Sequence, residues 1–397
     1  MNARPLPLLG AMPEPVARPR VALLGKGFRP FFLLAALYAC AIVPIWILIV
    51  GGVLPPSSYV DAWSWHAHEM IFGFTTAVVA GFLLTAVGNW TQRETAVGAP
   101  LAGLAALWAL GRVAMAVASS LPRGVAAIAD LAFLPALIVV LARPLVAARN
   151  RRNFVMLAVL GALFAANLVV HLDALGFLPL GSARRACLAS VDVVILLVVV
   201  ITGRVVPMFT RNATGVPTTR SIPALDAITV VALAALVAFD VAGKVAPIAA
   251  AIAGALALAR AARWGTIHTR PHPLLWVLHV GYAWIPVGLF LRALPVWSSL
   301  ATHALTAGAI GTLTLGMMAR VSLGHTGRPL VPPRSAAWAF AAITGAAIAR
   351  VVVPLVSMRW HFVALETAAG LWALAFALYV VGYGRALLTP RVDGKAG

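Results

Sequence analysis

Residues 63–88 read W-S-W-H-A-H-E-M-I-F-G-F-T-T-A-V-V-A-G-F-L-L-T-A-V-G, and this stretch decides the fold. After Glu69 it carries no charged side chain, and its length is close to the ~20 apolar residues that a helix needs to cross a bilayer. Its apolar residues are continuous rather than alternating, which excludes a strand of a transmembrane β-barrel. The stretch therefore predicts a membrane-spanning helix that begins with His66, His68 and Glu69.

Further apolar runs of similar length flank this one along the whole chain, separated by Pro, Gly and charged residues. They predict an all-α polytopic membrane protein with 12 transmembrane helices. The expected spans are 31–53, 66–88, 101–121, 124–142, 154–175, 186–206, 223–241, 245–263, 273–293, 299–320, 335–356 and 360–383.

The composition agrees with a membrane protein and excludes several other classes. Of the 397 residues, 62% are hydrophobic and 10% are charged, whereas a soluble domain carries about 25% charged residues. An ordinary soluble enzyme, a disordered protein and a secreted disulfide scaffold are therefore excluded. Cys40 and Cys187 form no C-x-x-C motif, so a zinc or iron–sulfur site built from cysteines is excluded as well.

The net charge of +19 reflects membrane topology and not a nucleic-acid partner. Most Lys and Arg residues fall in the N-terminal segment, in every second loop and in the C-terminal segment. By the positive-inside rule both termini are expected in the cytoplasm. We expect a disordered cytoplasmic tail at 1–26, a single 12-helix membrane domain at 27–385 and a cytoplasmic tail at 386–397.

Ionisable residues gather in the outer third of the expected spans, and histidines are prominent among them. Such residues are costly inside a bilayer, so they are expected to face the bundle interior and to pair. Carboxylate–arginine pairs that lock helices together explain single acids, and a hydrogen bond explains any one histidine as well as ligation does. The group favours a metal or haem site, since imidazole binds both haem iron and copper. Its histidines are His66, His68, His171, His303 and His361.

Three similar segments suggest an internal repeat. They read N-W-T-Q-R at 89–93, M-F-T-R-N at 208–212 and G-H-T-G-R at 324–328, each after a second helix in a set of four. The alternative explanation, chance together with shared helix-end chemistry, is equally good. If the repeat is real, the chain forms three parallel four-helix units, and His68 and His303 face each other at equal depth.

The spacing of His66 and His68 limits what the pair can bind. Residues i and i+2 of a helix point about 200° apart, so both cannot ligate one metal unless the first turn unwinds. One histidine is then expected to ligate a cofactor and the other to face the outer surface or a second metal.

Several long segments resemble those of the NnrS family over almost the whole chain. They are G-F-R-P-F-F (27–32), W-H-A-H-E-M-I-F-G-F (65–74), A-G-F-L-L-T-A-V-G-N-W-T (80–91), G-R-V-V-P-M-F-T-R-N (203–212) and H-A-L-T-A-G-A-I-G-T-L-T-L-G-M-M-A-R-V-S-L-G-H-T-G-R (303–328). The chain departs from the family pattern at Gly88, where a Pro often stands. The resemblance implies a haem- and copper-containing membrane protein of the bacterial inner membrane, linked to denitrification and nitric oxide tolerance.

Twelve spans in three four-helix arcs also resemble the catalytic subunits of haem–copper oxidases, whose second and tenth helices clamp a haem. By that analogy His68 and His303 would be the axial pair of a haem, expected to be of b type, and Arg350 would neutralise its propionates. Pairing of Arg350 with Glu366 or Asp192 is the alternative. The chain lacks an H-x-H on the tenth span and paired histidines on the seventh, which argues against an oxidase-type binuclear centre. The candidate copper ligands are His66, His171 and Met70.

The function implied by the resemblance is a haem- and copper-binding membrane protein that binds or processes nitric oxide and protects against nitrosative stress. Whether it is an enzyme stays open. A true NO-reducing enzyme would require an electron donor that the sequence does not identify. The alternative from a different class is a secondary transporter, a proton-coupled carrier of small molecules, for which twelve spans and buried carboxylates would also serve.

Overall fold

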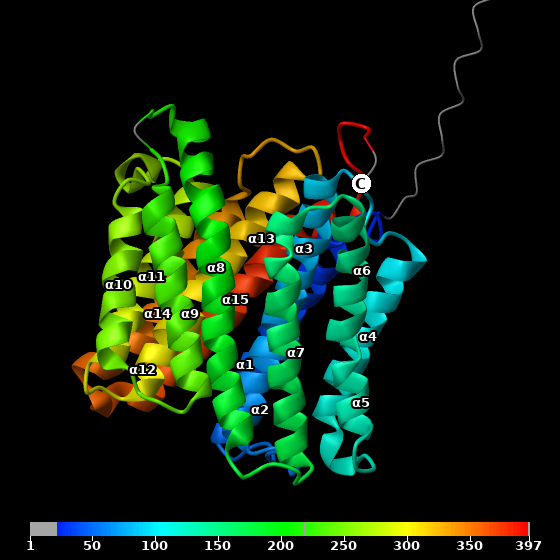
Figure 1. Cartoon of the computed structure of the whole chain (residues 1–397), viewed down its shortest axis with the longest axis vertical. Coiled ribbons are helices and arrows are strands. Elements are labelled where there is room, and N and C mark those ends of the chain that lie inside the picture. The colour runs from blue at the N-terminus through cyan, green and yellow to red at the C-terminus, as the bar shows by residue number, and fades with distance from the viewer. Residues whose placement is uncertain (1–21, 218, 396–397) are drawn as a thin grey trace, which may run out of the picture.

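The computed structural model describes residues 22–217 and 219–395. Its helices run side by side along the long axis of a bundle, with both ends of the described chain at the same end (Figure 1). There the backbone N–H of Ala22 donates to the carbonyl of Leu388 over 2.8 Å. Most of the expected tail at 1–26, and the last two residues of the chain, lie outside the described residues.

The described residues form twelve membrane-type segments in chain order, and several of these are interrupted. The segments are α1 (Phe28–Val50), α2 (Ala62–His68) with η1 (Glu69–Thr75) and α3 (Thr76–Thr91), α4 (Ala99–Ala116), α5 (Val125–Leu131) with α6 (Phe133–Ala147), α7 (Val155–Ala174), α8 (Ser182–Thr214), α9 (Pro223–Val241), α10 (Pro247–Ala261), α11 (Pro273–Ala293), α12 (Ser298–His303) with η5 (Ala304–Gly311) and α13 (Thr312–Gly324), α14 (Arg334–Val356), and α15 (His361–Leu388).

The all-helical, polytopic membrane fold is confirmed. Within the described ranges, eleven segments are long and apolar enough to cross a membrane. The exception is α10, which has 15 residues where the sequence predicts a span at 245–263. A helix rises about 1.5 Å per residue, so α10 covers only about 22 Å of the ~30 Å hydrocarbon core.

Two of the segments change from α-helix to π-helix directly after a histidine. In the second segment η1 begins after His68, and in the tenth η5 begins after His303. The two π-helices begin 235 residues apart, which is also the spacing of Thr91 and Thr326 in the repeated sequence segments. Single π-helical turns are rare and concentrate at functional sites. The second and tenth segments therefore share a local structure as well as a sequence pattern.

Paired glycines give these two segments the same contact with the helix before them. A Cβ on Gly73 or Gly81 would lie 2.7 Å from the ring of Tyr38 or 2.9 Å from that of Phe32, both on α1. On Gly308 or Gly316 it would lie 2.6 Å from Trp284 or 2.8 Å from Val277, both on α11. Side chains at these positions would push the helices apart, because protein interiors are close-packed.

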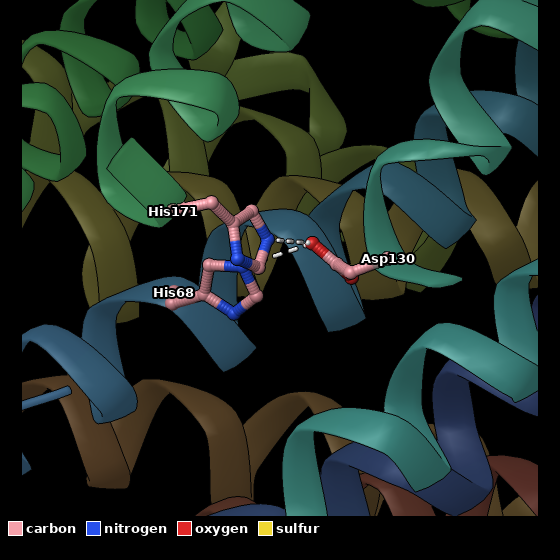
Figure 2. Close-up of side chains that lie close together, drawn as sticks. All are labelled: His68, Asp130 and His171. Carbon is pink, nitrogen blue, oxygen red and sulfur yellow. Dashed lines mark hydrogen bonds and ion pairs between the residues drawn. The ribbon is translucent and has the colours of Figure 1, made fainter. Parts of the chain in front are cut away.

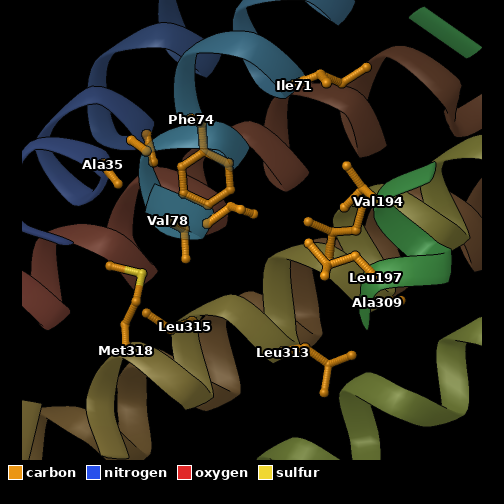
Figure 3. Close-up of a cluster of buried hydrophobic side chains, with 14 of the residues drawn as sticks. Ala35, Ile71, Phe74, Val78, Val194, Leu197, Ala309, Leu313, Leu315 and Met318 are labelled. Atoms are coloured by element: carbon orange, nitrogen blue, oxygen red, sulfur yellow. The ribbon is translucent and has the colours of Figure 1, made fainter. Parts of the chain in front are cut away.

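The second, sixth and tenth membrane segments, each the second of a four-helix set, meet in the apolar core (Figure 3). Phe74 and Val78 come from the first set, Val194 and Leu197 from the second, and Leu313 from the third. Contacts join α8 with both η1 and η5. This arrangement puts the histidine-bearing ends of α2 and α12 at the same end of the bundle, opposite the described termini (Figure 1).

Candidate functional site

His68, Asp130 and His171 form a buried group in which each residue offers one ligand atom (Figure 2). The Nε2 atoms of His68 and His171 lie 3.1 Å and 2.9 Å from Oδ2 of Asp130. All three side chains are almost fully buried. Asn167 completes the group: its Nδ2 donates to the same oxygen over 2.7 Å, and its Oδ1 lies 2.9 Å from Nε2 of His68.

Breaks in two segments and the end of a third bring these side chains together. His68 is the last residue of α2 before the π-helix, and His171 lies in the last turn of α7. Asp130 lies at the C-terminal end of α5, just before the break between α5 and α6. Pro135 follows that break and has no N–H to donate to the carbonyl of Leu131, which accounts for the interruption at this point. Asn167 precedes His171 by one helical turn and so lies on the same helix face.

A second layer of hydrogen bonds holds the outer nitrogen of each histidine. Nδ1 of His68 lies 2.8 Å from Oε1 of Glu69, and Nδ1 of His171 lies 2.9 Å from the hydroxyl of Tyr59. Burial raises the pKa of Tyr59 to about 12, so its hydroxyl stays protonated and can donate to the ring or accept from it. Metal-ligating histidines characteristically use their second nitrogen in this way.

The carboxylates outnumber the cationic groups in this hydrogen-bonded set. Arg112 donates through Nη1 to both oxygens of Glu69, over 2.9 Å and 2.8 Å, and through Nη2 to Asp130. Tyr38 donates a further bond to Glu69. With neutral histidines, two carboxylates and one guanidinium leave one negative charge, and all three groups are buried. An uncompensated charge in a membrane interior is unfavourable, so the group is suited to a cation.

A second polar cluster lies beside the first at the same end of the bundle and contains His66, His303, His361 and Arg350. Arg350, His66 and His361 all lie near His303. Arg350 donates to the hydroxyl of Ser299 over 2.9 Å. The cluster joins α2, α12, α14 and α15. Among the residues named here, the full charge is the positive charge of Arg350.

Aromatic side chains form the walls of this second cluster. The ring of His66 stacks on Trp46 of α1 with centroids 4.6 Å apart. Trp297 contacts both His361, at 5.0 Å between centroids, and Arg350, at 5.7 Å from the guanidinium carbon. These rings give the cluster largely apolar surroundings.

Several polar atoms of the second cluster lack partners. Nδ1 of His66, Nδ1 of His361 and Nη1 of Arg350 are buried without a hydrogen-bond partner among the described residues. Nδ1 of His303 donates to the carbonyl of Ser299 over 2.7 Å, which leaves the lone pair of Nε2 available to a ligand. Buried polar groups are almost always satisfied, so these three nitrogens are available to bind a ligand.

The structure places His68 and His303 in different clusters, whereas the sequence predicted that the two residues share one site. His68 bonds with α5 and α7, whereas His303 shares its cluster with His66 and Arg350. The expectation that His68 and His303 face each other therefore needs correction, because the ring of His68 turns into the first group. The divergence of His66 and His68 is as helical geometry predicts.

The remaining expectations concern Met70 and the partner of Arg350. Met70 is half-buried in η1 and packs against the apolar core, outside the three-residue group described above. Asp192 bonds with Arg292 over 3.0 Å and 2.8 Å, so it is not the partner of Arg350. Among the described residues, Arg350 forms no ion pair with Glu366.

Sequence analysis missed the residues that complete both clusters. Asn167 precedes His171 by four residues, a spacing that identifies a common helix face and could have revealed it. Ser299 precedes His303 on α12 by the same four residues and carries the same signal. No comparable signal exists for the others, which come from α1, from the loop before α2 and from the residue before α12. They are Tyr38, Trp46, Tyr59 and Trp297.

These features define a class of protein: a polytopic helical membrane protein with a histidine–carboxylate group in its interior that could hold a metal. A family model described as "NnrS protein" matches residues 22–391. The chain therefore belongs to the NnrS family. A comparison with curated proteins found no match.

Proposed function

We propose that this chain is a haem- and copper-binding protein of the bacterial inner membrane, with cytoplasmic termini, that binds or processes nitric oxide and protects against nitrosative stress. The observation that carries the proposal is the buried group of His68, Asp130 and His171, whose three ligand atoms lie within 4.8 Å of one another. Membership of the NnrS family supports the link with nitric oxide.

Copper fits the first group. Two imidazole nitrogens and one carboxylate oxygen are donors that suit copper and other first-row transition metals. His68, His171 and Asp130 would be the ligands, while Glu69 and Tyr59 fix the orientations of the two rings. Asn167 and Arg112 hold the carboxylate of Asp130 from its other side. A bound cation would also bring the charge of the group into balance.

Haem fits the second cluster. Histidines from α2 and α12, an arginine and a lining of tryptophan rings match an iron porphyrin with two carboxylate side chains. His303 and His66 would hold the iron, and Arg350 would bind a propionate through its unsatisfied Nη1. Haem iron would supply the binding of nitric oxide.

The protein's own residues supply the selectivity of the site. Ser299 orients the ring of His303 through its carbonyl and holds Arg350 through its hydroxyl. Trp46 stacks on the imidazole of His66, and Trp297 contacts that of His361. If nitric oxide is turned over rather than bound once, electrons must come from a donor outside this chain.

The test is an absorption spectrum of the purified protein in detergent, oxidised and reduced, with and without nitric oxide, and a metal analysis of the same sample. A haem spectrum that shifts with nitric oxide, together with stoichiometric copper, would support the proposal. Repeated consumption of nitric oxide by reduced protein would identify an NO-reducing enzyme. A folded protein that takes up neither haem nor copper would overturn the proposal and favour a transporter.

A further inference from the structure

A cavity of about 570 Å³ opens at the end of the bundle that carries the described termini, far from both histidine clusters. It lies between the C-terminal ends of α13 and α15, the loop before α14 and the segment after α15. Three arginines line it: Arg328 from the loop, Arg385 from α15 and Arg391 from the last segment. Nothing in the proposed function uses this cavity.

Positive charge dominates the cavity. Arg391 forms an ion pair with Asp393, the acidic residue next to it. Arg328 and Arg385 have no carboxylate partner among the described residues. Arg29 adds a further positive charge, since its guanidinium lies near Arg328 and Arg391.

The guanidinium of Arg328 is held in place but only partly satisfied. Its Nη2 donates to Oγ1 of Thr389 over 2.9 Å. Its Nη1 is buried and has no hydrogen-bond partner in the part of the chain that the structure describes. Burial and the charge of Arg385 both lower the pKa of Arg328. A fixed, buried donor beside like charges is the environment that an anion relieves.

A neutral donor lies next to the same cavity. Oγ of Ser335 lies against Gly382, which lines the cavity, and is buried without a partner among the described residues. Phosphate oxygens accept hydrogen bonds from guanidinium and hydroxyl groups alike, and arginine can bind them through two parallel bonds. The lining also includes apolar residues, Leu323 and Val331 among them, which would suit a ligand that carries hydrocarbon.

We propose that this cavity is a binding site for a phosphate group, with Arg328 and Arg385 as its cationic ligands. Two sources share this chemistry: the headgroup of an anionic phospholipid in the cytoplasmic leaflet, and a soluble phosphate. The ligand would fasten the G-H-T-G-R segment at 324–328 to the end of α15. The site does not depend on haem or copper.

The experiment measures binding of phosphatidylglycerol to the full-length protein in neutral detergent, by native mass spectrometry. Phosphatidylcholine is the lipid control, and inorganic phosphate is the soluble competitor. We expect Arg328→Gln to weaken phosphatidylglycerol binding about tenfold, which is the effect of one lost charge-assisted bond. Arg334→Gln removes the same charge from an exposed position outside the cavity and should change the affinity less than twofold.

A second variant tests the proposal in case Arg328→Gln does not fold. Arg385 is exposed, so Arg385→Gln should fold and should also weaken binding. Displacement of the lipid by millimolar phosphate would show that the site takes free phosphate too, while no displacement would assign it to the lipid. Equal affinities for the two lipids, or equal effects of the Arg328 and Arg334 variants, would overturn the proposal. Haem and copper contents should be unchanged in every variant.

Discussion

His66 and His68 lie two residues apart on α2, and their side chains belong to two different polar clusters. His66 stacks on Trp46 of α1, whereas His68 bonds with Asp130 of α5 and Asn167 of α7. One turn of helix therefore faces two candidate sites, one with an excess of negative charge and one with an excess of positive charge. If copper and haem bind as proposed, one turn of α2 carries a ligand of each.

The buried carboxylate of Asp130 gives the first prediction. Asp130→Asn keeps the shape of the side chain but removes the negative charge and the ligand oxygen, so copper affinity should fall by at least about tenfold. Metal analysis after dialysis against a weak chelator measures this effect. Glu366→Gln is the matched control, since Glu366 is an exposed acid on α15. Full copper retention by Asp130→Asn would show that the carboxylate only pairs with Arg112.

His303 gives the second prediction. Its Nε2 has a free lone pair, because Nδ1 donates to the carbonyl of Ser299. His303→Ala should therefore abolish the haem spectrum of folded protein while copper stays bound in the other cluster. His268→Ala changes an exposed histidine and should leave the spectrum intact. An unchanged spectrum in the His303 variant would remove this residue from the axial assignment.

Arg350 gives the third prediction, which concerns how tightly haem is retained and not which residues bind its iron. Arg350→Gln removes the positive charge and the unsatisfied Nη1, so a propionate loses a charge-assisted bond, about 1.5–3 kcal/mol. Haem loss to an apoprotein acceptor should accelerate about tenfold or more, with the peak positions of the spectrum preserved. Arg359→Gln, at an exposed position before α15, is the control. Equal rates of loss in both variants would contradict propionate binding by Arg350.

The glycine contacts give the fourth prediction. A Cβ on Gly308 would lie 2.6 Å from Trp284, and overpacking of this kind destabilises a protein by about 1–3 kcal/mol. Gly308→Ala should therefore lower the thermal unfolding temperature in detergent. Gly370→Ala on α15 has open space around it and should raise that temperature, because alanine in a helix is favoured over glycine by about 0.5–1 kcal/mol. The same sign in both variants would exclude packing as the reason for the glycine.

His325 gives the fifth prediction, on pH dependence. Burial, and then the charges of Arg391 and Lys26, lower the pKa of His325 in the folded protein. The unfolded chain binds the proton at a higher pH, near the usual value of about 6.5, so the contribution of His325 to stability is complete above that pH and is lost as the pH falls. Thermal unfolding between pH 8 and pH 5.5 should show a smaller loss in His325→Gln than in the unaltered protein. Identical slopes would show that His325 does not contribute.

The sequence alone determined the membrane segments. Crossing a bilayer requires a local run of apolar residues, and such a run is visible without knowledge of any neighbour. The sequence also indicated the family, and it suggested a repeat that relates His68 to His303. In the structure a π-helix begins after each of these two residues. The expected spans differ from the helices at their ends: α8 runs from Ser182 to Thr214 where 186–206 was expected, and α10 is short. The sequence marks an apolar run without marking where the helix begins and ends.

Only the tertiary structure decided which polar side chains meet. The group at Asp130 needs α2, the break between α5 and α6, and the last turn of α7 to converge, and each of these helices contributes one side chain. The repeat in the sequence predicted that His68 and His303 face each other. A repeat indicates that two residues lie at equal depth, but not in which direction their side chains point. The direction in which each ring points depends on helix rotation, and helix rotation depends on packing over the whole bundle. For that reason the sequence identified the layer of histidines, and the fold divided it into two sites.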